Sequence, residues 1–361
     1  MATRNQITIR QVAKEAGVSA QTVSRVINDH PDVAPETRRR VERVITALGY
    51  QPNAIARSLI HQRSQSIGVV AMASEHFGPS RTLVGIEKQS RNLGYTLLLD
   101  FLHHPEIENV EQILNRLLSR QVDGIIWAVP EIGSNRSWLL DKAYSLPVPM
   151  IFISMHAEPG LAVAAIDNYR GARLATEHLL QQGYQNIGLI TGPPDWWEAR
   201  QRRLGWQDAL LAAGRPATQT RIAEGDWSAS RGQKAFYTLV DQFPEIDAVF
   251  ASNDQTALGV LHAAQREGRR VPEDLGVVGF DNIPESAFFL PPLTTVEQPL
   301  LELGSLAVEE LGRIIQTEQQ KSEPVKPGSL VLEPRIVIRE SSVRNNGQNL
   351  KSLMEIENYE N

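Results

Sequence analysis

The 361-residue chain is too long for one ordinary domain, and its 42% of hydrophobic residues can fill more than one core. The absence of cysteine excludes disulfides, thiolate metal sites and a cysteine nucleophile, and the eight histidines lack metal-ligand spacing. The net charge of −6 is uneven, since residues 1–63 carry +5 (ten Lys/Arg, five Asp/Glu) and the remainder −11. A basic head on an acidic body indicates a nucleic-acid-binding module joined to another kind of domain.

Three short helices are predicted at the start of the chain. Thr8 and Gln11 have the spacing of a capping box before the first helix, and Gly17 is a natural stop for it. Ser19 can cap the second helix, and the third is expected over residues 35–48. Two short helices around a tight turn, followed by a supporting helix, are typical of a helix-turn-helix module.

In such a module the second helix enters the major groove, and its first residues read base edges. Gln21 can pair with both edge atoms of adenine, Arg25 with both acceptors of guanine, and Ala20 can touch a thymine methyl group. The remaining polar residues suit phosphates, which position the protein without specifying sequence: Thr8, Arg10, Ser19, Thr22, Ser24 and Asn28. The alternative is a helical bundle whose polar faces are merely solvated.

Residues 8–59, TIRQVAKEAGVSAQTVSRVINDHPDVAPETRRRVERVITALGYQPNAIARSL, closely resemble the amino-terminal signature of the lactose/galactose repressor family. The resemblance implies a hinge helix over residues 53–59 that contacts DNA through Asn53, Ala56, Arg57 and Leu59. Seven residues are fewer than the ~12 that an isolated helix needs, so we expect this helix to order only beside its dimer mate on DNA. Leu59 would then act as an apolar wedge between base steps.

From about residue 64, apolar runs alternate with amphipathic stretches. The runs begin at residues 67, 95, 124, 149, 187, 248 and 275, and the helices are expected near 81–93, 106–119, 134–144, 168–182, 199–213, 228–241 and 253–267. This alternation predicts an α/β body of two doubly wound parallel sheets, one in each of two lobes. The cleft between the lobes, beyond the carboxyl ends of the strands, is then the expected ligand site.

The family resemblance extends over the body. It rests on the motifs RRLGW at 202, GDWSAS at 225, NDQTALG at 253, GFD at 279 and PPLTTVEQ at 291. It implies the two-lobed fold of periplasmic binding proteins, with the chain crossing between lobes near residues 164, 292 and 325. The expected division is a helix-turn-helix domain (1–50), a hinge (51–63), an effector-binding domain (64–340) and a polar tail (341–361). Within the effector-binding domain the first lobe comprises 64–164 and 292–325, and the second 165–291 and 326–340.

By the same resemblance Arg202, Trp227, Asn253 and Asp281 match the effector-contacting positions of the family. Their chemistry suits a sugar, because the arginine fork, the carboxylate and the amide can bind adjacent hydroxyls while an indole covers the C–H face. The structural alternative is that Asp281 caps the next helix and that Arg202 forms a salt bridge between domains. No metal and no cofactor are expected.

Further candidates for the effector site stand near the same strand ends: His76, Phe77, Trp127, Trp196, Trp197, Glu198 and Gln298. Ser154 and Ala128 occupy positions where the lactose-responsive member of the family has an aspartate and an asparagine. These departures disfavour lactose itself. The additional aromatic residues favour a glucoside or an oligosaccharide.

The sequence thus predicts a cytoplasmic transcription regulator, most simply a repressor, that binds a palindromic operator as a dimer and is released by a sugar. Cytoplasmic placement follows from the lack of a signal peptide and of a membrane-length apolar run. The lack of a long heptad repeat after Glu340 favours a dimer over a tetramer. The alternatives are a glycoside hydrolase using Asp281 and Glu198, a non-specific nucleoid protein and a periplasmic transport protein.

Overall fold

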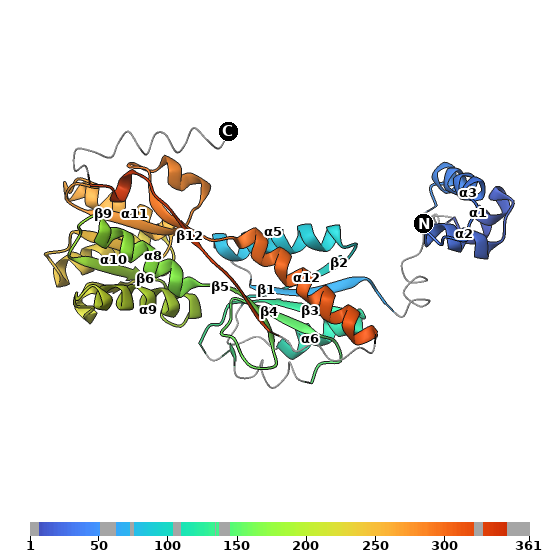
Figure 1. Cartoon of the computed structure of the whole chain (residues 1–361), viewed down its shortest axis with the longest axis horizontal. Helices are drawn as coiled ribbons and strands as arrows, with labels where there is room; N and C mark the ends of the chain where they lie inside the picture. The colour runs from blue at the N-terminus through green and yellow to red at the C-terminus, as the bar shows by residue number, and fades with distance from the viewer. Residues whose placement is uncertain are drawn as a thin grey trace, which may run out of the picture. The chain divides into compact units, whose positions relative to one another are not determined.

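The computed structural model describes residues 7–50, 63–72, 76–103, 110–133, 135–136, 145–320 and 328–344. The chain divides into two compact units at residue 65 (Figure 1). The hinge residues Asn53, Ala56, Arg57 and Leu59 lie outside the described residues, as does the tail beyond Arg344. No helix in the described part of the chain is long and apolar enough to cross a membrane.

The amino-terminal unit has the three predicted helices: α1 (Ile9–Ala16), α2 (Ala20–Ile27) and α3 (Pro35–Leu48). The predicted caps are confirmed. Thr8 and Gln11 form a capping box, the Ser19 hydroxyl accepts a hydrogen bond from the amide of Thr22, and Gly17 ends α1 with φ of 63°. Local sequence therefore sets the ends of the first two helices.

A small apolar core holds these helices together, with Val12, Val23 and Val41 fully buried at its centre. The connection from α2 to α3 is fixed by Arg38, which donates to the Asp29 carboxylate at 2.5 Å and to the carbonyl of His30 at 2.7 Å. Because one valine from each helix fills the core, the crossing of α1 and α2 is set by packing as well as by the turn.

The first lobe of the larger unit contains a six-stranded parallel sheet in the order β11-β5-β4-β3-β1-β2. Its strands are β1 (Ser66–Met72), β2 (Thr96–Leu102), β3 (Gly124–Ala128), β4 (Met150–Ile153), β5 (Ala162–Ile166) and β11 (Ser329–Leu332). Helices cover both faces: α5 (Phe77–Asn92) and α12 (Leu300–Gln319) pack on one, and α6 (Val110–Ser119) packs on the other.

Helices α5 and α12 run side by side on that face (Figure 1). A Cβ atom on Gly85 would lie 2.2 Å from the carbonyl oxygen of Leu301, and one on Gly304 would lie 2.3 Å from that of Thr82. The two backbones can approach this closely only because both positions are glycine.

The second lobe contains another six-stranded sheet, in the order β12-β10-β9-β8-β6-β7. Its strands are β6 (Ile187–Thr191), β7 (Ile222–Glu224), β8 (Ala248–Ala251), β9 (Gly276–Asp281), β10 (Thr294–Glu297) and the antiparallel edge strand β12 (Arg335–Val337). Four helices cover it: α8 (Asn168–Gln181) and α9 (Trp197–Ala212) on one face, α10 (Ala229–Gln242) and α11 (Asp254–Arg266) on the other. Short 3-10 turns occupy Gln219–Arg221, Pro284–Phe288 and Glu340–Ser342.

All seven predicted strands are present, and six of the seven predicted helices are confirmed, with α5 beginning at Phe77, four residues early. The helix expected near 134–144 lies mostly outside the described residues. The prediction of two doubly wound lobes is therefore correct, although β12 makes the second sheet mixed rather than purely parallel.

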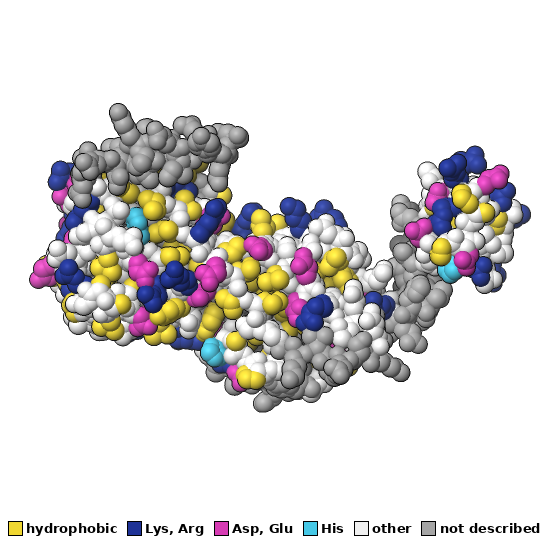
Figure 2. All heavy atoms as spheres, in the orientation of Figure 1, with side chains coloured by type: hydrophobic (Ala, Val, Ile, Leu, Met, Phe, Trp, Pro, Cys, Tyr) yellow, Lys and Arg dark blue, Asp and Glu magenta, His cyan; other side chains and the backbone are white. Residues whose placement is uncertain are grey.

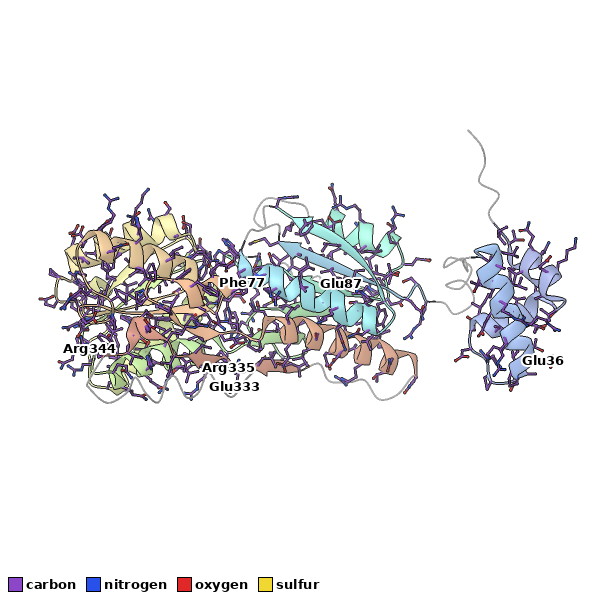
Figure 3. All side chains as sticks on the ribbon, turned by 90° about the horizontal axis from the view of Figure 1, so that it is seen from above. Glu36, Phe77, Glu87, Glu333, Arg335 and Arg344 are labelled. Atoms are coloured by element: carbon purple, nitrogen blue, oxygen red, sulfur yellow. The ribbon has the colours of Figure 1, made fainter. Side chains whose placement is uncertain are left out.

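Two of the three predicted lobe crossings fall too early. Strand β10 belongs to the second sheet, so the chain returns to the first lobe at residues 298–299 rather than near 292. Strand β11 still belongs to the first sheet, so the last crossing falls at 333–334 rather than near 325. Glu333 and Arg335 mark this crossing in Figure 3. The first crossing, at residue 167, is close to the predicted 164.

The second lobe also extends beyond residue 340, where a polar tail was predicted. Ser341 is fully buried, donates to the carbonyl of Val277 at 2.6 Å and accepts from the amide of Thr294 at 2.8 Å. Ser342 is fully buried too, 2.7 Å from Nε2 of His178. Their polarity, which suggested a solvated tail, is matched by hydrogen bonds inside the lobe.

Candidate functional site

The amino-terminal unit exposes the polar side of α2. Gln21 and Arg25 are exposed one helical turn apart, while Val23 and Val26 are buried on the opposite side. Of the other predicted DNA contacts, Thr8, Ser19 and Asn28 are exposed, and Ala20, Thr22 and Ser24 are half-buried. Figure 2 shows Lys and Arg side chains at the surface of this unit. The residues predicted to read bases are therefore free of the core and displayed together.

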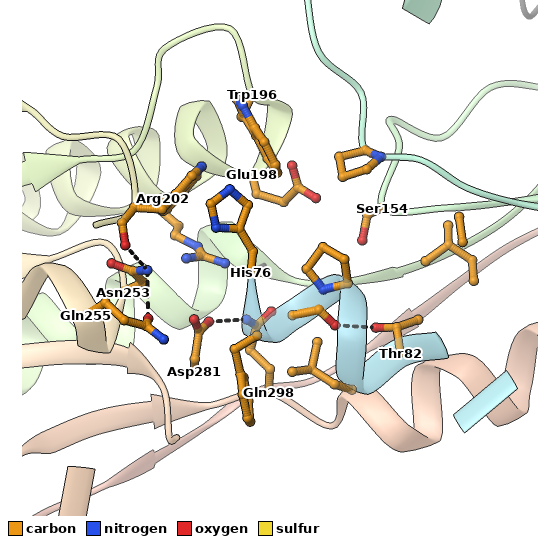
Figure 4. Close-up of a pocket in the computed structure, with 18 of the residues that line it drawn as sticks. His76, Thr82, Ser154, Trp196, Glu198, Arg202, Asn253, Gln255, Asp281 and Gln298 are labelled. Atoms are coloured by element: carbon orange, nitrogen blue, oxygen red, sulfur yellow. Dashed lines mark hydrogen bonds between the residues drawn. The ribbon is translucent and has the colours of Figure 1, made fainter. Parts of the chain in front are cut away.

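The larger unit has a cavity of about 290 Å³ between its two lobes (Figure 4). It lies at the carboxyl ends of the strands, as predicted, since Ala128 ends β3 and Asp281 ends β9. Eight of the nine predicted effector residues line it: His76, Phe77, Trp196, Arg202, Trp227, Asn253, Asp281 and Gln298. Their role in binding a ligand remains a prediction.

The ninth prediction, that Trp127 lines the site, is wrong. Trp127 is fully buried in the apolar layer between the sheet and α6. Side chains alternate along β3, so Trp127 points to that layer whereas its neighbour Ala128 borders the cavity.

Arg202 lies on α9 and is almost completely buried. Its Nε donates to Oδ1 of Asn168 at 2.8 Å, and its Nη1 donates to the carbonyl of Ser252. The guanidinium carbon lies 3.8 Å from the ring centre of Phe280. Burial lowers the pKa of Arg202, which nearby carboxylates such as Asp281 partly offset. Nη2 has no hydrogen-bond partner among the described residues. The guanidinium is therefore held in place through its other two nitrogen atoms, and Nη2 is available to donate to a ligand.

Asp281 is the last residue of β9 and accepts a hydrogen bond from Nε2 of Gln298 at 2.6 Å. Burial raises the pKa of Asp281 to about 6, although the charge of Arg202 opposes the shift. Asp281 caps no helix and Arg202 forms no salt bridge in the described structure, so the two structural alternatives considered for them do not hold.

The side-chain amide of Asn253 is not free to bind a ligand at both ends, because its oxygen and its nitrogen are both hydrogen-bonded within the second lobe. Its Oδ1 caps α11 by accepting from the amide of Thr256 at 2.9 Å. Its Nδ2 donates to the carbonyl of Trp227 and to Oε1 of Gln255, both at 2.9 Å. Both amide hydrogens are engaged, so Asn253 mainly positions the backbone of Trp227.

An aromatic row crosses the cavity from one lobe to the other. The ring of His76, from the first lobe, packs edge-on against the ring of Trp196, and Trp196 packs in the same way against Trp227. The ring centres are 5.6 Å apart in both pairs. The Trp227 ring lies against Gly192, where a Cβ atom would come within 2.1 Å of it. Phe77 packs against the cores of both lobes and lies between them (Figure 3).

Three residues of the cavity wall have left-handed backbone conformations, with φ of 57° at Ser154, 73° at Trp227 and 111° at Asp281. For non-glycine residues such conformations cost roughly 1–3 kcal/mol each and are concentrated at functional sites. Sequence reasoning gave no sign of this strain. It also missed Gln255 and Ser228, which line the cavity at the starts of α11 and α10.

Glu198, in the first turn of α9, borders the cavity, and its carboxylate lies on the side of Ser154 in Figure 4. Its Oε2 is shielded from solvent and has no hydrogen-bond partner among the described residues. Burial raises the pKa of Glu198 to about 7, while Arg202 acts in the opposite direction. Without a ligand, this carboxylate is thus poorly compensated at neutral pH.

This leads to a prediction for stability. Because the folded-state pKa of Glu198 is raised, its carboxyl group favours folding at low pH, and that contribution is lost as the pH rises from about 4.5 to about 7. We expect Glu198→Gln to match the wild type near pH 4 and, at pH 8, to have a free energy of unfolding about 3 kcal/mol higher than that of the wild type. Urea unfolding of ligand-free protein at both pH values measures this.

The matched control is Glu302→Gln, which removes an exposed carboxylate from α12. It should change the free energy of unfolding little at either pH. An equal effect of Glu198→Gln at the two pH values would show that packing, and not the buried charge, is responsible.

One unit of the chain is a helix-turn-helix with exposed base-reading residues, and the other has two lobes with a cavity at its strand ends. Together the two units define a DNA-binding regulator with a ligand-binding domain. Residues 8–53 match the family model for bacterial regulatory proteins, lacI family, and residues 176–342 match that for a periplasmic binding protein-like domain.

Known proteins are similar along almost the whole chain. The HTH-type transcriptional repressor PurR of Glaesserella parasuis is 36% identical over 343 residues, covering 94% of this chain and 99% of PurR. The solved lac repressor dimer bound to operator and the anti-inducer ONPF is 31% identical, with a TM-score of 0.82 and coverage of 94% and 100%. The complex of transcriptional regulator CelR with cellobiose is 31% identical, with a TM-score of 0.68 and coverage of 93% and 99%. The chain belongs to the lacI family of bacterial regulatory proteins, and is a DNA-binding transcription regulator rather than an enzyme.

Proposed function

We propose that this regulator binds a palindromic operator as a homodimer through α2, and that a sugar or small glycoside in the cleft releases it. The observation that carries the proposal is the composition of the cavity wall. One fixed arginine, one buried carboxylate and a row of aromatic rings face the same space from two lobes.

Each of these groups suits one part of a sugar. Nη2 of Arg202 can donate to ring hydroxyls, and Asp281 can accept from them. The Trp227 face can cover C–H groups, and its buried Nε1 has no partner among the described residues. Buried polar atoms are normally satisfied, so Trp227 Nε1 and Glu198 Oε2 indicate that a polar ligand completes the site.

The size of the cavity limits the ligand. At about 290 Å³ it is at the lower end of the roughly 300–1,000 Å³ found for small-molecule sites. This favours a monosaccharide or a short glycoside over a longer oligosaccharide. The CelR complex with cellobiose supports the choice of disaccharides among the first ligands to test.

Exposed apolar residues on each lobe support the homodimer. Leu99 and Phe101 at the edge strand β2 are 44% and 41% exposed, beside a depression that also involves Val84. On the second lobe Phe288 and Leu290 are 84% and 90% exposed. Apolar groups displayed in this way usually mark an interface, and a two-fold dimer matches the symmetry of a palindrome. The similar lac repressor is a dimer on its operator.

The proposal is tested by selecting an operator from random DNA with the full-length protein, then titrating the labelled complex with mono- and disaccharides while following anisotropy. We expect the selected site to be palindromic and at least one sugar to lower its occupancy. A site without symmetry would contradict dimeric binding. Release by purine bases but by no sugar would contradict the ligand class.

The DNA-reading residues give a separate prediction. Gln21→Ala and Arg25→Ala should each weaken binding to the selected operator by about 1–3 kcal/mol and leave binding to random DNA nearly unchanged, because each removes contacts with base edges. Competition gel shifts measure both affinities. Arg40→Ala removes an exposed arginine from α3 and serves as the control, whose loss, if any, should be equal on both DNAs. Equal losses for Gln21→Ala or Arg25→Ala would make them phosphate contacts.

A further inference from the structure

One wall of the cavity contains a direct contact between loops of the two lobes. We call this contact the strap and define it as residues 131–133 of the first lobe and 195–197 of the second. At its centre Ile132 and Trp196 form an isolated antiparallel bridge. The strap joins the lobes without a covalent chain crossing.

Two backbone hydrogen bonds flank the bridge. The amide of Gly133 donates to the carbonyl of Asp195 at 3.1 Å, and the amide of Trp197 donates to the carbonyl of Glu131 at 2.9 Å. A pairing this short is not stable by itself in water. The pairing can therefore open without unfolding either lobe.

A charged contact reinforces the strap. The Glu131 side chain is 8% exposed, and its Oε1 accepts from Nη2 of Arg200 in the second lobe at 2.8 Å. Its Oε2 accepts from the amide of His156 at 3.1 Å, within its own lobe. Arg200 is 39% exposed and also donates to the carbonyl of Asp195 at 2.6 Å. Arg200 is thus the side chain of the second lobe that holds Glu131.

The strap is continuous with the cavity wall. Trp196, half of the bridge, lines the cavity and stands in the middle of the aromatic row. Pro130 precedes the strap and Glu198 follows it, and both line the cavity too. A ligand that contacts Trp196 and Glu198 would therefore touch residues whose positions depend on the closed strap.

We propose that the strap is a gate of the cleft, which opens to let a ligand pass and closes again beside it. The inference rests on the proposed function, because it takes the cavity to be a ligand site. Closure of the cleft then depends on this pairing between the two lobes. A ligand that contacts Trp196 and Glu198 stabilises the closed form, because the positions of both residues depend on the closed strap.

The first test needs no ligand. In the full-length protein we expect the amides of Gly133 and Trp197 to be protected from hydrogen exchange, and Arg200→Gln to speed their exchange about five-fold, as loss of a partly exposed ion pair should. Amides of β6 should be unaffected, which shows that the lobe remains folded. Arg203→Gln, which removes an exposed arginine from the same helix, is the control. Unprotected amides in the wild type, or no effect of Arg200→Gln, would overturn the proposal.

The second test locks the gate. Gly133 and Asp195 flank the bridge, share one of its hydrogen bonds and do not line the cavity; Cα atoms of such a hydrogen-bonded pair lie about 5.5 Å apart, within the range of a disulfide. Since the chain has no cysteine, G133C/D195C would contain a single possible disulfide within each chain. Stopped-flow fluorescence with cellobiose then compares the oxidised and reduced forms of one variant.

We expect the reduced form to bind cellobiose and the oxidised form to lose binding for as long as the disulfide is intact. Equal association rates for the two forms would overturn the gate. If the wild-type protein binds neither cellobiose nor any other sugar, the proposed ligand class fails, and the hydrogen-exchange result alone decides whether the strap opens.

Discussion

A fragment comprising residues 64–361 is expected to bind the operator at least about 10³-fold more weakly than the full-length protein, at physiological salt. The fragment has a formal charge of −11 at neutral pH, since residues 64–361 hold 26 Lys/Arg and 37 Asp/Glu, and it should repel phosphates. The base-reading residues Gln21 and Arg25 are removed with the basic head, so both the electrostatic and the specific contributions to binding are lost.

Fluorescence anisotropy at several salt concentrations measures this loss. For the full-length protein the logarithm of affinity should fall steeply with the logarithm of salt concentration. Residues from Ser66 onward form a compact unit of their own, so the fragment should still fold, sediment as a dimer and bind the sugar. Operator binding by the fragment at physiological salt would contradict the proposed division of labour.

The alternation of apolar runs and amphipathic stretches was sufficient to predict the two lobes, because each strand-helix unit is a local pattern. Signals for the remaining strands are weaker. Strand β5 is AVAAI, whose alanines have little strand preference, and β12 has three residues. Helix α12 was not predicted, although LLELGSLAVEEL has apolar residues at helical spacing. The lobe crossings were placed by the family resemblance, and the two strands that correct them, β10 and β11, were not among the predicted strands.

The cavity residues could be predicted from family motifs, but the partners of their side chains could not. Asn253 caps a helix and holds Trp227, and Trp127 points away from the cavity, because the pleat of β3 decides its side. The ion pair that reinforces the strap joins Glu131 to Arg200, which lie 69 positions apart and in different lobes. Contacts of this kind depend on how the two lobes pack against each other, and local sequence patterns do not specify this.

The structure also changes what removal of Arg202 is expected to do. Its guanidinium satisfies Oδ1 of Asn168 and the carbonyl of Ser252, and it stacks on Phe280. Arg202→Ala would leave two buried acceptors without this donor and would open a cavity, so we expect the free energy of unfolding to fall by about 3–5 kcal/mol. Thermal and urea unfolding measure this, with Arg203→Ala on the exposed side of α9 as the control.

The larger effect is expected in the response to the ligand. Lowering operator occupancy from about 99% to about 1% requires the sugar to prefer the releasing state by roughly 10⁴-fold. A hydrogen bond from a charged group contributes about 1.5–3 kcal/mol, so loss of Arg202 should raise the sugar concentration needed for half-release by about 10- to 150-fold. Affinity for the operator without sugar should be unchanged, because Arg202 lies in the cleft and not in the DNA-binding unit.

Unchanged operator affinity also shows that the variant is folded under the conditions of the assay, which separates the loss of response from the loss of stability. Arg202→Lys keeps the charge but not the planar fork, and should have an intermediate response if two or more hydroxyls are bound together. Anisotropy of labelled operator, titrated with the effective sugar, compares the three proteins. Release of the Arg202→Ala protein at the wild-type sugar concentration would exclude Arg202 from the switch.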